Sequence, residues 1–219
     1  MADSWHNRRA MNDLTRYRSG AIVTGGGGNP DGKGANGFLL DWYRSEPRGV
    51  VVKPERQILA EYFTSMLILS ASFKYKPAIG AENYLYVMDG DWSLSLIHPD
   101  QWSRERRAGF VGTCVLQPDM TWTIEPSENL SVDGPVADAV ARFYDAFAES
   151  LSTDLTLEEV LPFYVARMPY YQRLYANALS RSIRRAVTMG GQRSMQSQDW
   201  QQLLPRSGRR LIGAGTDSS

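Results

Sequence analysis

The chain has 219 residues, of which 42% are hydrophobic and 22% charged, and its formal net charge at neutral pH is zero. This composition is ordinary for a soluble globular protein, and the length is sufficient for one large or two small domains with a proper core. A single cysteine excludes an internal disulfide and a cysteine-rich metal site, and it fits a reducing, cytoplasmic compartment.

The charges are distributed unevenly along the chain. Residues 160–219 contain nine arginines against two aspartates, whereas residues 1–159 contain 15 Lys and Arg against 22 Asp and Glu. One interpretation is that the basic C-terminal part docks on the acidic remainder of this chain or of a neighbouring one, or is simply solvated. The other is a tail that faces nucleic acid or a membrane surface. The first interpretation is favoured.

Residues 1–53 are predicted to be Gly-rich and largely irregular, and their polar start shows no apolar stretch typical of a signal peptide. Residues 27–34 match the pattern G-x-x-x-x-G-K of a phosphate-binding loop that includes Lys33. However, Gly34 occupies the position of the hydroxyl residue that would bind Mg²⁺, and no clear helix follows. A flexible linker is therefore the favoured interpretation of this stretch.

A helix is predicted from Pro54 to about Tyr75, because proline suits the first helical position and Pro77 ends the pattern. The stretch from Ile58 to Phe73 is too short and too polar for a membrane span. The apolar residues of this helix recur at helical spacing and form a broad stripe: Ile58, Leu59, Tyr62, Phe63, Met66, Leu67 and Phe73.

The dipeptide Asp89-Gly90 predicts a two-residue turn and therefore fixes the register of a β-hairpin. One face of this hairpin collects Leu85, Val87, Trp92, Leu94 and Leu96. The other face collects Tyr84, Tyr86, Met88, Asp91, Ser93 and Ser95. Further strands are predicted at about 110–116 and 120–124, and the helical stripe is the natural cover for the first face.

Several motifs in this region keep the order and spacing of a known family. They are Tyr84-Leu85-Tyr86, the run from Ser95 to Trp102, Phe110-Val111-Gly112, and the run from Leu116 to Thr123. The region from about 54 to 125 resembles an uncharacterised domain-of-unknown-function family, with members in bacteria and a small uncharacterised animal protein. The resemblance implies a fold relationship only and brings no catalytic or binding residues.

Helices are predicted from Pro135 to about Leu151, from a capping box at Thr156, and from Pro169 to Met189, with breaks at Pro162 and Pro169. Residues 191–219 are predicted to form a weakly ordered tail in which five apolar residues could dock: Trp200, Leu203, Leu204, Leu211 and Ile212. The predicted organisation is an irregular segment (1–53), a helix-plus-sheet domain (54–130), C-terminal helices on or beside it (131–190) and the tail (191–219). The fold class is α+β, with a small antiparallel sheet of three or four strands and flexible termini.

The sequence contains no recognisable catalytic, metal-binding or cofactor-binding constellation, and Cys114 is best explained by core packing. Candidate binding residues are the basic side of the last helix, namely Arg173, Arg181, Arg184 and Arg185. Tyr84 and Tyr86 could form an aromatic platform, although a cover of C-terminal helices is the favoured interpretation of their face.

Three functions follow as expectations. The leading hypothesis is a non-catalytic interaction or assembly module that binds a protein partner or a second copy of itself. The alternative is binding of nucleic acid or another anionic partner through the Arg-rich helix. The second alternative is a nucleotide-binding enzyme that uses the Gly-rich loop and Lys33.

Overall fold

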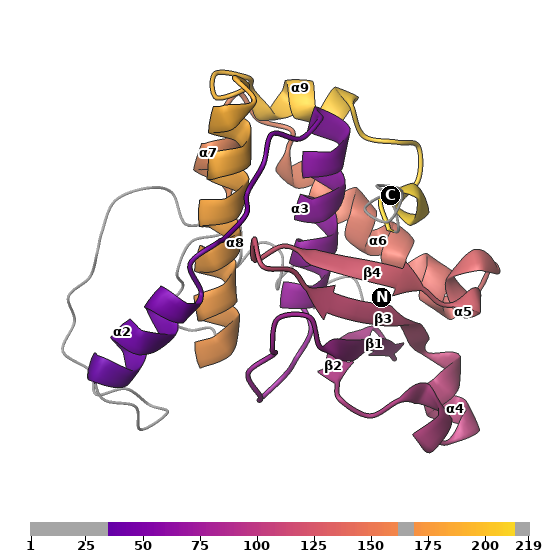
Figure 1. Cartoon of the computed structure of the whole chain (residues 1–219). Coiled ribbons are helices and arrows are strands. Elements are labelled where there is room, and N and C mark those ends of the chain that lie inside the picture. The colour runs from indigo at the N-terminus through magenta and orange to yellow at the C-terminus, as the bar shows by residue number, and fades with distance from the viewer. Residues whose placement is uncertain (1–34, 162–168, 213–219) are drawn as a thin grey trace.

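The computed structural model describes residues 35–161 and 169–212 (Figure 1). The elements are α2 (Ala35–Arg44), α3 (Glu55–Leu69), β1 (Glu82–Met88), β2 (Asp91–Ser95), η1 (Pro99–Gln101), α4 (Arg104–Ala108), β3 (Phe110–Leu116), β4 (Trp122–Pro126), α5 (Glu128–Ser131), α6 (Pro135–Ser150), α7 (Leu157–Val160), α8 (Tyr170–Met189), α9 (Ser197–Gln202) and η2 (Gly208–Arg210). The Gly-rich loop with Lys33 and the break expected at Pro162 lie outside the described residues.

The sheet is antiparallel with strand order β2-β1-β3-β4, which confirms the predicted α+β class. The predicted hairpin register is confirmed, since Leu85 pairs with Leu94 and Val87 with Trp92. Asp89 and Gly90 both have positive φ angles, as a type I′ turn requires. Strand β3 has the predicted bounds. Strand β4 begins two residues later than predicted, because Met120 adopts a φ of 66° within the preceding turn.

Helix α3 packs its apolar stripe against the sheet, but it ends at Leu69 instead of continuing to Tyr75. The chain beyond it becomes extended because Ser72 pairs with β2: its N–H donates to Trp92 O at 2.9 Å, and the N–H of Leu94 donates to Ser72 O at 3.1 Å. These bonds satisfy backbone groups at the outer edge of β2. The prediction overestimated the helix because sequence periodicity does not show this edge pairing.

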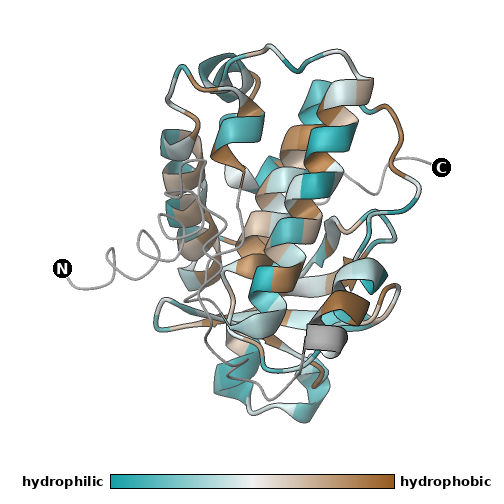
Figure 2. Cartoon of the chain, turned by 90° about the vertical axis from the view of Figure 1, so that its left-hand side faces the viewer, coloured by the Kyte–Doolittle hydropathy of each residue, from teal (hydrophilic) through white to brown (hydrophobic). Residues whose placement is uncertain are grey.

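The long helices α6 and α8 lie on the same side of the sheet as α3, and together they form a helical layer (Figure 1). The aromatic core joins the two layers, since the rings of Phe63 and Phe143 lie 5.6 Å apart and those of Phe143 and Trp92 lie 6.3 Å apart. In Figure 2, hydrophobic and hydrophilic residues alternate along the long helices, as expected for helices with one face on a core. Helix α6, the capping box at Thr156 and the end of α8 at Gly190 agree with the sequence prediction.

The opposite face of the sheet has a different cover from the one predicted. The segment that contains η1 and α4 lies there, and Tyr86 donates its hydroxyl hydrogen to Ile97 O at 2.9 Å. The rings of Tyr86 and Trp102 lie 6.4 Å apart, and those of Tyr84 and His98 lie 5.1 Å apart. The prediction that C-terminal helices cover this face is therefore wrong, because their apolar stripes are already buried against α3.

Two segments expected to lack structure are folded. Helix α2 lies within the segment predicted to be largely irregular, and residues 191–212 form α9 and η2 in place of a weakly ordered tail. Trp200 is completely buried in the core, and Leu211 and Ile212 are buried as well. Of the five apolar tail residues that were predicted to dock, Trp200, Leu211 and Ile212 therefore belong to the core.

Cys114 lies on β3 opposite Ile124 and is completely buried, in agreement with its predicted role in core packing. Burial raises the pKa of its thiol. Within the described residues, no helix is both long enough and apolar enough to cross a membrane.

Replacing Gly112 with Ala is expected to destabilise the sheet by about 1–3 kcal/mol. An added Cβ would lie 2.4 Å from the carbonyl oxygen of Glu125 on the neighbouring strand, so the backbone of β3 or β4 must move. Urea denaturation followed by tryptophan fluorescence measures the loss. Thr113→Ala, on the next residue of the same strand, is the control and should cost less than about 1 kcal/mol. Equal losses in the two variants would contradict the close-approach argument.

Candidate functional site

Residues 35–53, termed the arm, consist of α2 and the extended chain that leads to α3. In Figure 1, α2 projects at the left of the molecule, and the chain then runs beside α8 towards the first turn of α3. Three groups of polar and charged side chains along the arm contact the body.

The first group surrounds the carboxyl of Asp41, which is 5% exposed. Lys76 donates to Asp41 Oδ1 at 2.6 Å, and the hydroxyl of Tyr170 donates to Asp41 Oδ2 at 2.9 Å. Asp41 thereby attaches α2 both to the loop before β1 and to the first turn of α8.

The second group surrounds Glu46, whose carboxylate forms ion pairs with Arg181 and Arg185 of α8. Arg181 also donates to Ser45 O at 3.0 Å, and Arg185 donates to Pro47 O at 2.9 Å. Partial burial lowers the pKa of the Arg181 guanidinium, whereas the neighbouring Glu46 opposes that shift. The same guanidinium lies 4.6 Å from the ring centroid of Trp42 on α2.

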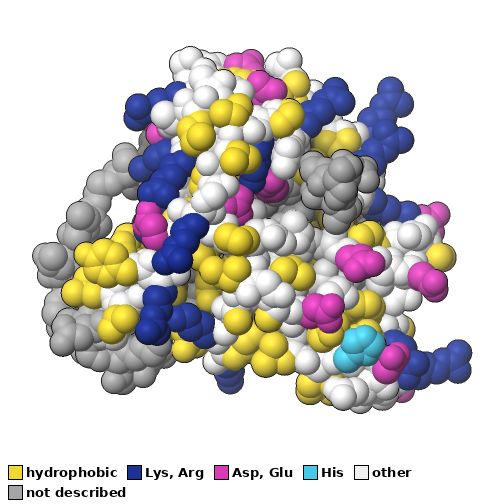
Figure 3. All heavy atoms as spheres, viewed as in Figure 1, with side chains coloured by type: hydrophobic (Ala, Val, Ile, Leu, Met, Phe, Trp, Pro, Cys, Tyr) yellow, Lys and Arg dark blue, Asp and Glu magenta, His cyan; other side chains and the backbone are white. Residues whose placement is uncertain are grey.

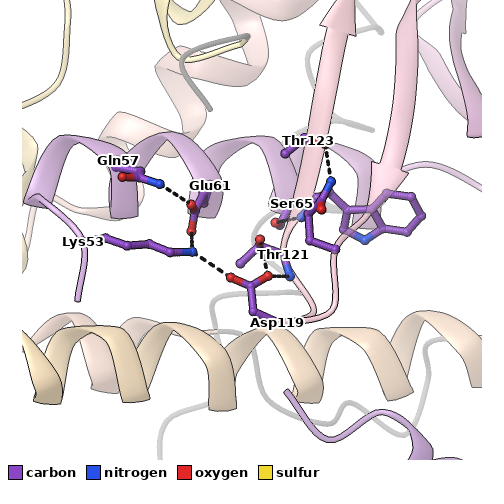
Figure 4. Close-up of polar contacts among 9 residues, drawn as sticks. Lys53, Gln57, Glu61, Ser65, Asp119, Thr121 and Thr123 are labelled. Carbon is purple, nitrogen blue, oxygen red and sulfur yellow. Dashed lines mark hydrogen bonds and ion pairs between the residues drawn. The ribbon is translucent and has the colours of Figure 1, made fainter. Parts of the chain in front are cut away.

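The third group is a buried ionic cluster at the end of the arm, shown in Figure 4. The ammonium of Lys53 lies 2.7 Å from a carboxylate oxygen of Glu61 on α3 and 2.7 Å from one of Asp119 in the β3–β4 turn. Gln57 donates to the other oxygen of Glu61 at 3.0 Å, and Thr121 donates its hydroxyl hydrogen to Asp119 at 2.7 Å. All three charged residues are less than a tenth exposed.

The electrostatics of this cluster indicate a structural role. Burial alone would lower the pKa of Lys53, but its hydrogen bonds to Asp119 and Glu61 outweigh burial and raise it. Burial raises the pKa of Glu61, and the ion pair with Lys53 offsets this only in part. A lysine held protonated between two carboxylates is a poor base or nucleophile. The cluster therefore joins the arm, α3 and the β3–β4 turn.

Five apolar side chains of the arm are exposed instead. Leu39, Leu40 and Tyr43 of α2 are 49%, 51% and 72% exposed, and Val51 and Val52 are 55% and 62% exposed. Leu39 and Tyr43 are four positions apart and therefore lie on one side of the helix. Figure 3 shows hydrophobic side chains over the position of α2, beside Lys and Arg side chains. These five residues are termed the outer apolar set.

Two other predicted binding residues lie elsewhere on α8. Arg173 is 6% exposed, so its side chain is largely withdrawn from the surface. Arg184 lies 3.7 Å from the carboxylate of Glu158, which also pairs with Arg193 at 3.3 Å. Arg181, Arg184 and Arg185 thus pair with acidic residues of the first 159 positions. These contacts support the interpretation that the basic C-terminal part docks on the acidic remainder of the same chain.

The two predicted tyrosines are buried rather than presented as a platform. Tyr86 is completely buried and Tyr84 is 8% exposed, with its hydroxyl hydrogen donated to Glu82 at 2.8 Å. Burial raises the pKa of Tyr86 to about 12. Stacking of a base or peptide on these rings would require the segment with η1 and α4 to move away.

Within residues 35–161 and 169–212, no group of three or more His, Cys, Asp or Glu side chains is arranged to hold a metal ion. Comparison of the chain with family models, with curated proteins and with solved structures found no match.

The sequence pattern indicates Arg181 and Arg185 as binding residues, but it indicates neither their partners nor the outer apolar set. The spacing of Leu39, Leu40 and Tyr43 is a helical signal that could have been noticed. Asn36 and Gly37 are poor helix formers directly before it, and the preceding Gly-rich stretch favoured an irregular interpretation.

Proposed function

We propose that the chain is a non-catalytic interaction module and that the arm is its docking element. The observation that carries the proposal is the inverted arrangement of the arm. Its polar side chains Asp41, Ser45 and Lys53 are each less than a tenth exposed, whereas the five residues of the outer apolar set are about half exposed or more.

In a protein that binds nothing, this arrangement would leave apolar side chains in water with no compensating gain in free energy. A surface segment of a monomeric protein normally buries its apolar side chains and solvates its charges. Leu39, Leu40 and Tyr43 lie within about one turn of α2, and exposed apolar residues that cluster on the surface are typical of interaction sites. Holding such residues at the surface through ion pairs to Glu46 and Asp41 fixes their geometry before a partner arrives, which lowers the entropy cost of binding.

A photo-reactive amino acid at position 43 of the full chain tests the proposal in an extract of the source cells. We expect a discrete cross-linked species from position 43. Position 107 is the matched control, because Arg107 is also exposed but lies on α4, on the other side of the sheet. Adding Leu39→Ser and Leu40→Ser should reduce the cross-linked species about tenfold or more, since each removes exposed apolar contact area.

The stability of the chain provides the second readout. Leu39 and Leu40 are exposed, so the paired serine substitutions should change the free energy of unfolding by less than about 1 kcal/mol. Reduced cross-linking with unchanged stability assigns the effect to docking. Equal cross-linking from positions 43 and 107, or none from position 43, would refute the proposal.

A further inference from the structure

The buried ionic cluster holds an amine and a carboxyl group from remote parts of the chain in contact (Figure 4). Lys53 Nζ lies 2.7 Å from Asp119 Oδ2, although 66 positions separate the two residues in the sequence. Two groups that are held in a well-oriented contact react as if their concentration were about 10⁵–10⁸ M. The fold therefore removes a large part of the entropy cost of joining this amine and this carboxyl group in an amide bond.

The burial of the cluster favours the same reaction. Lys53, Glu61 and Asp119 are 8%, 7% and 8% exposed, so little water reaches them. Water is the product of amide formation and the reactant in its reversal, so a site that excludes water protects the bond from hydrolysis. Condensation also replaces two buried opposite charges with a neutral amide, which removes the cost of keeping these charges out of water.

The two carboxyl groups have different surroundings, which assign them different roles. Asp119 Oδ1 accepts the N–H of Thr121 at 3.1 Å and its hydroxyl hydrogen at 2.7 Å. Negative charge develops on this oxygen when a nucleophile adds to the carboxyl carbon, and the two donors stabilise that charge. Glu61 lies 2.7 Å from the Lys53 ammonium, and burial raises the pKa of its carboxyl, which suits a group that accepts a proton.

We propose that Lys53 and Asp119 form an intramolecular isopeptide bond, with Glu61 as the catalytic acid and base. The ammonium of Lys53 first transfers one proton to Glu61, which leaves a neutral amine. The amine lone pair attacks the carboxyl carbon of Asp119, and the electrons of one C–O bond move to Oδ1 beside Thr121. The nitrogen then loses a second proton, Oδ2 leaves with both protons as water, and Oδ1 becomes the amide oxygen. Glu61 relays these protons and ends unchanged.

This bond goes beyond the proposed docking function and does not depend on it. Each chain reacts once with itself, so the step is a self-modification that needs no external substrate. The bond attaches the end of the arm covalently to the β3–β4 turn. In the product the amide N–H replaces the ammonium as the donor to Glu61, and burial without an ion pair raises the pKa of Glu61 further.

Mass spectrometry of the purified full chain, denatured before the measurement, tests the inference. The expected mass is lower than that of the sequence by one water molecule. Cyclisation of an Asp-Gly pair to a succinimide loses the same mass, and the sequence contains such pairs at Asp31, Asp89 and Asp133. A tryptic digest therefore has to locate the change. The expected product is a peptide of residues 49–56 joined to a peptide of residues 108–142.

Variants of the cluster test the role of each group. Glu61→Gln leaves the amine and the Asp119 carboxyl in place but removes the proton relay, so the linked peptide should form about 100-fold more slowly or less. Lys53→Arg keeps the positive charge and should give no linked peptide, and its mass provides the reference for N-terminal processing. Gln57→Ala is the matched control, because Gln57 contacts Glu61 but transfers no proton, so its rate should change by less than about tenfold. Circular dichroism establishes that each variant is folded.

The wild-type chain alone decides the inference, whether or not the variants fold. A mass equal to that of the sequence after prolonged incubation of the folded chain at neutral pH would overturn it. A loss of water that the digest places at an Asp-Gly pair, with no linked peptide, would overturn it as well. Formation of the linked peptide at the wild-type rate in folded Glu61→Gln would overturn the assigned role of Glu61.

Discussion

Replacing Lys53 with Met should lower the free energy of unfolding by about 3–5 kcal/mol, the range for removing one partner of a buried ion pair. The substitution leaves the carboxylates of Glu61 and Asp119 facing each other, and these residues are 7% and 8% exposed. Urea denaturation measures the loss. Lys74→Met is the matched control, because Lys74 is exposed and forms no ion pair with the described residues, so its cost should stay within about 0.5 kcal/mol.

The cost of Lys53→Met should depend on pH. Burial already raises the pKa of Glu61 in the native protein, so its folded state binds a proton more tightly than its unfolded state. Without Lys53 this difference grows, and protonation at falling pH then favours the folded state. The stability deficit of the variant should therefore shrink as the pH is lowered, and adding Glu61→Gln should recover part of it at neutral pH. A deficit that is the same at every pH would mean that lost packing, not unpaired charge, is the cause.

Replacing Trp200 with Ala should cost about 3–5 kcal/mol, because the indole is completely buried and its loss leaves a large cavity. Gln198→Ala on the same helix is the control, since Gln198 is exposed and its removal leaves the core intact. Urea denaturation gives the free energy of unfolding of both variants and so compares the loss of a core side chain with the loss of a surface one. A loss below about 1 kcal/mol for Trp200→Ala would show that residues 191–212 contribute little to folding.

The parts of the fold that the sequence predicted correctly depend on neighbouring residues. The turn at Asp89-Gly90 defines the hairpin register, and Gly190 ends α8, because backbone conformation at these positions is decided locally. The cover of the tyrosine face was predicted wrongly because an apolar stripe shows that a helix is buried but not against which surface. The stripe with Phe143 and Phe147 packs against Phe63 instead.

The arm could not be predicted for a similar reason. The partners of Glu46 on α8 are separated from it by 135 and 139 positions, and the partner of Lys53 in the β3–β4 turn by 66. A charged residue in a polar segment looks solvated when its partner is so remote in sequence. Only the packed structure shows that Asp41 and Lys53 of the arm are buried whereas the outer apolar set is exposed.

Because Cys114 is buried, its thiol can report on transient opening of the sheet. The chain has one cysteine, and it lies in the centre of the sheet with no exposed surface. A maleimide therefore reaches it only when the sheet separates, so the rate of native labelling measures the frequency of that event. For the same reason, a cysteine introduced at position 43 or 51 can be labelled selectively with a fluorophore while the native thiol stays in place.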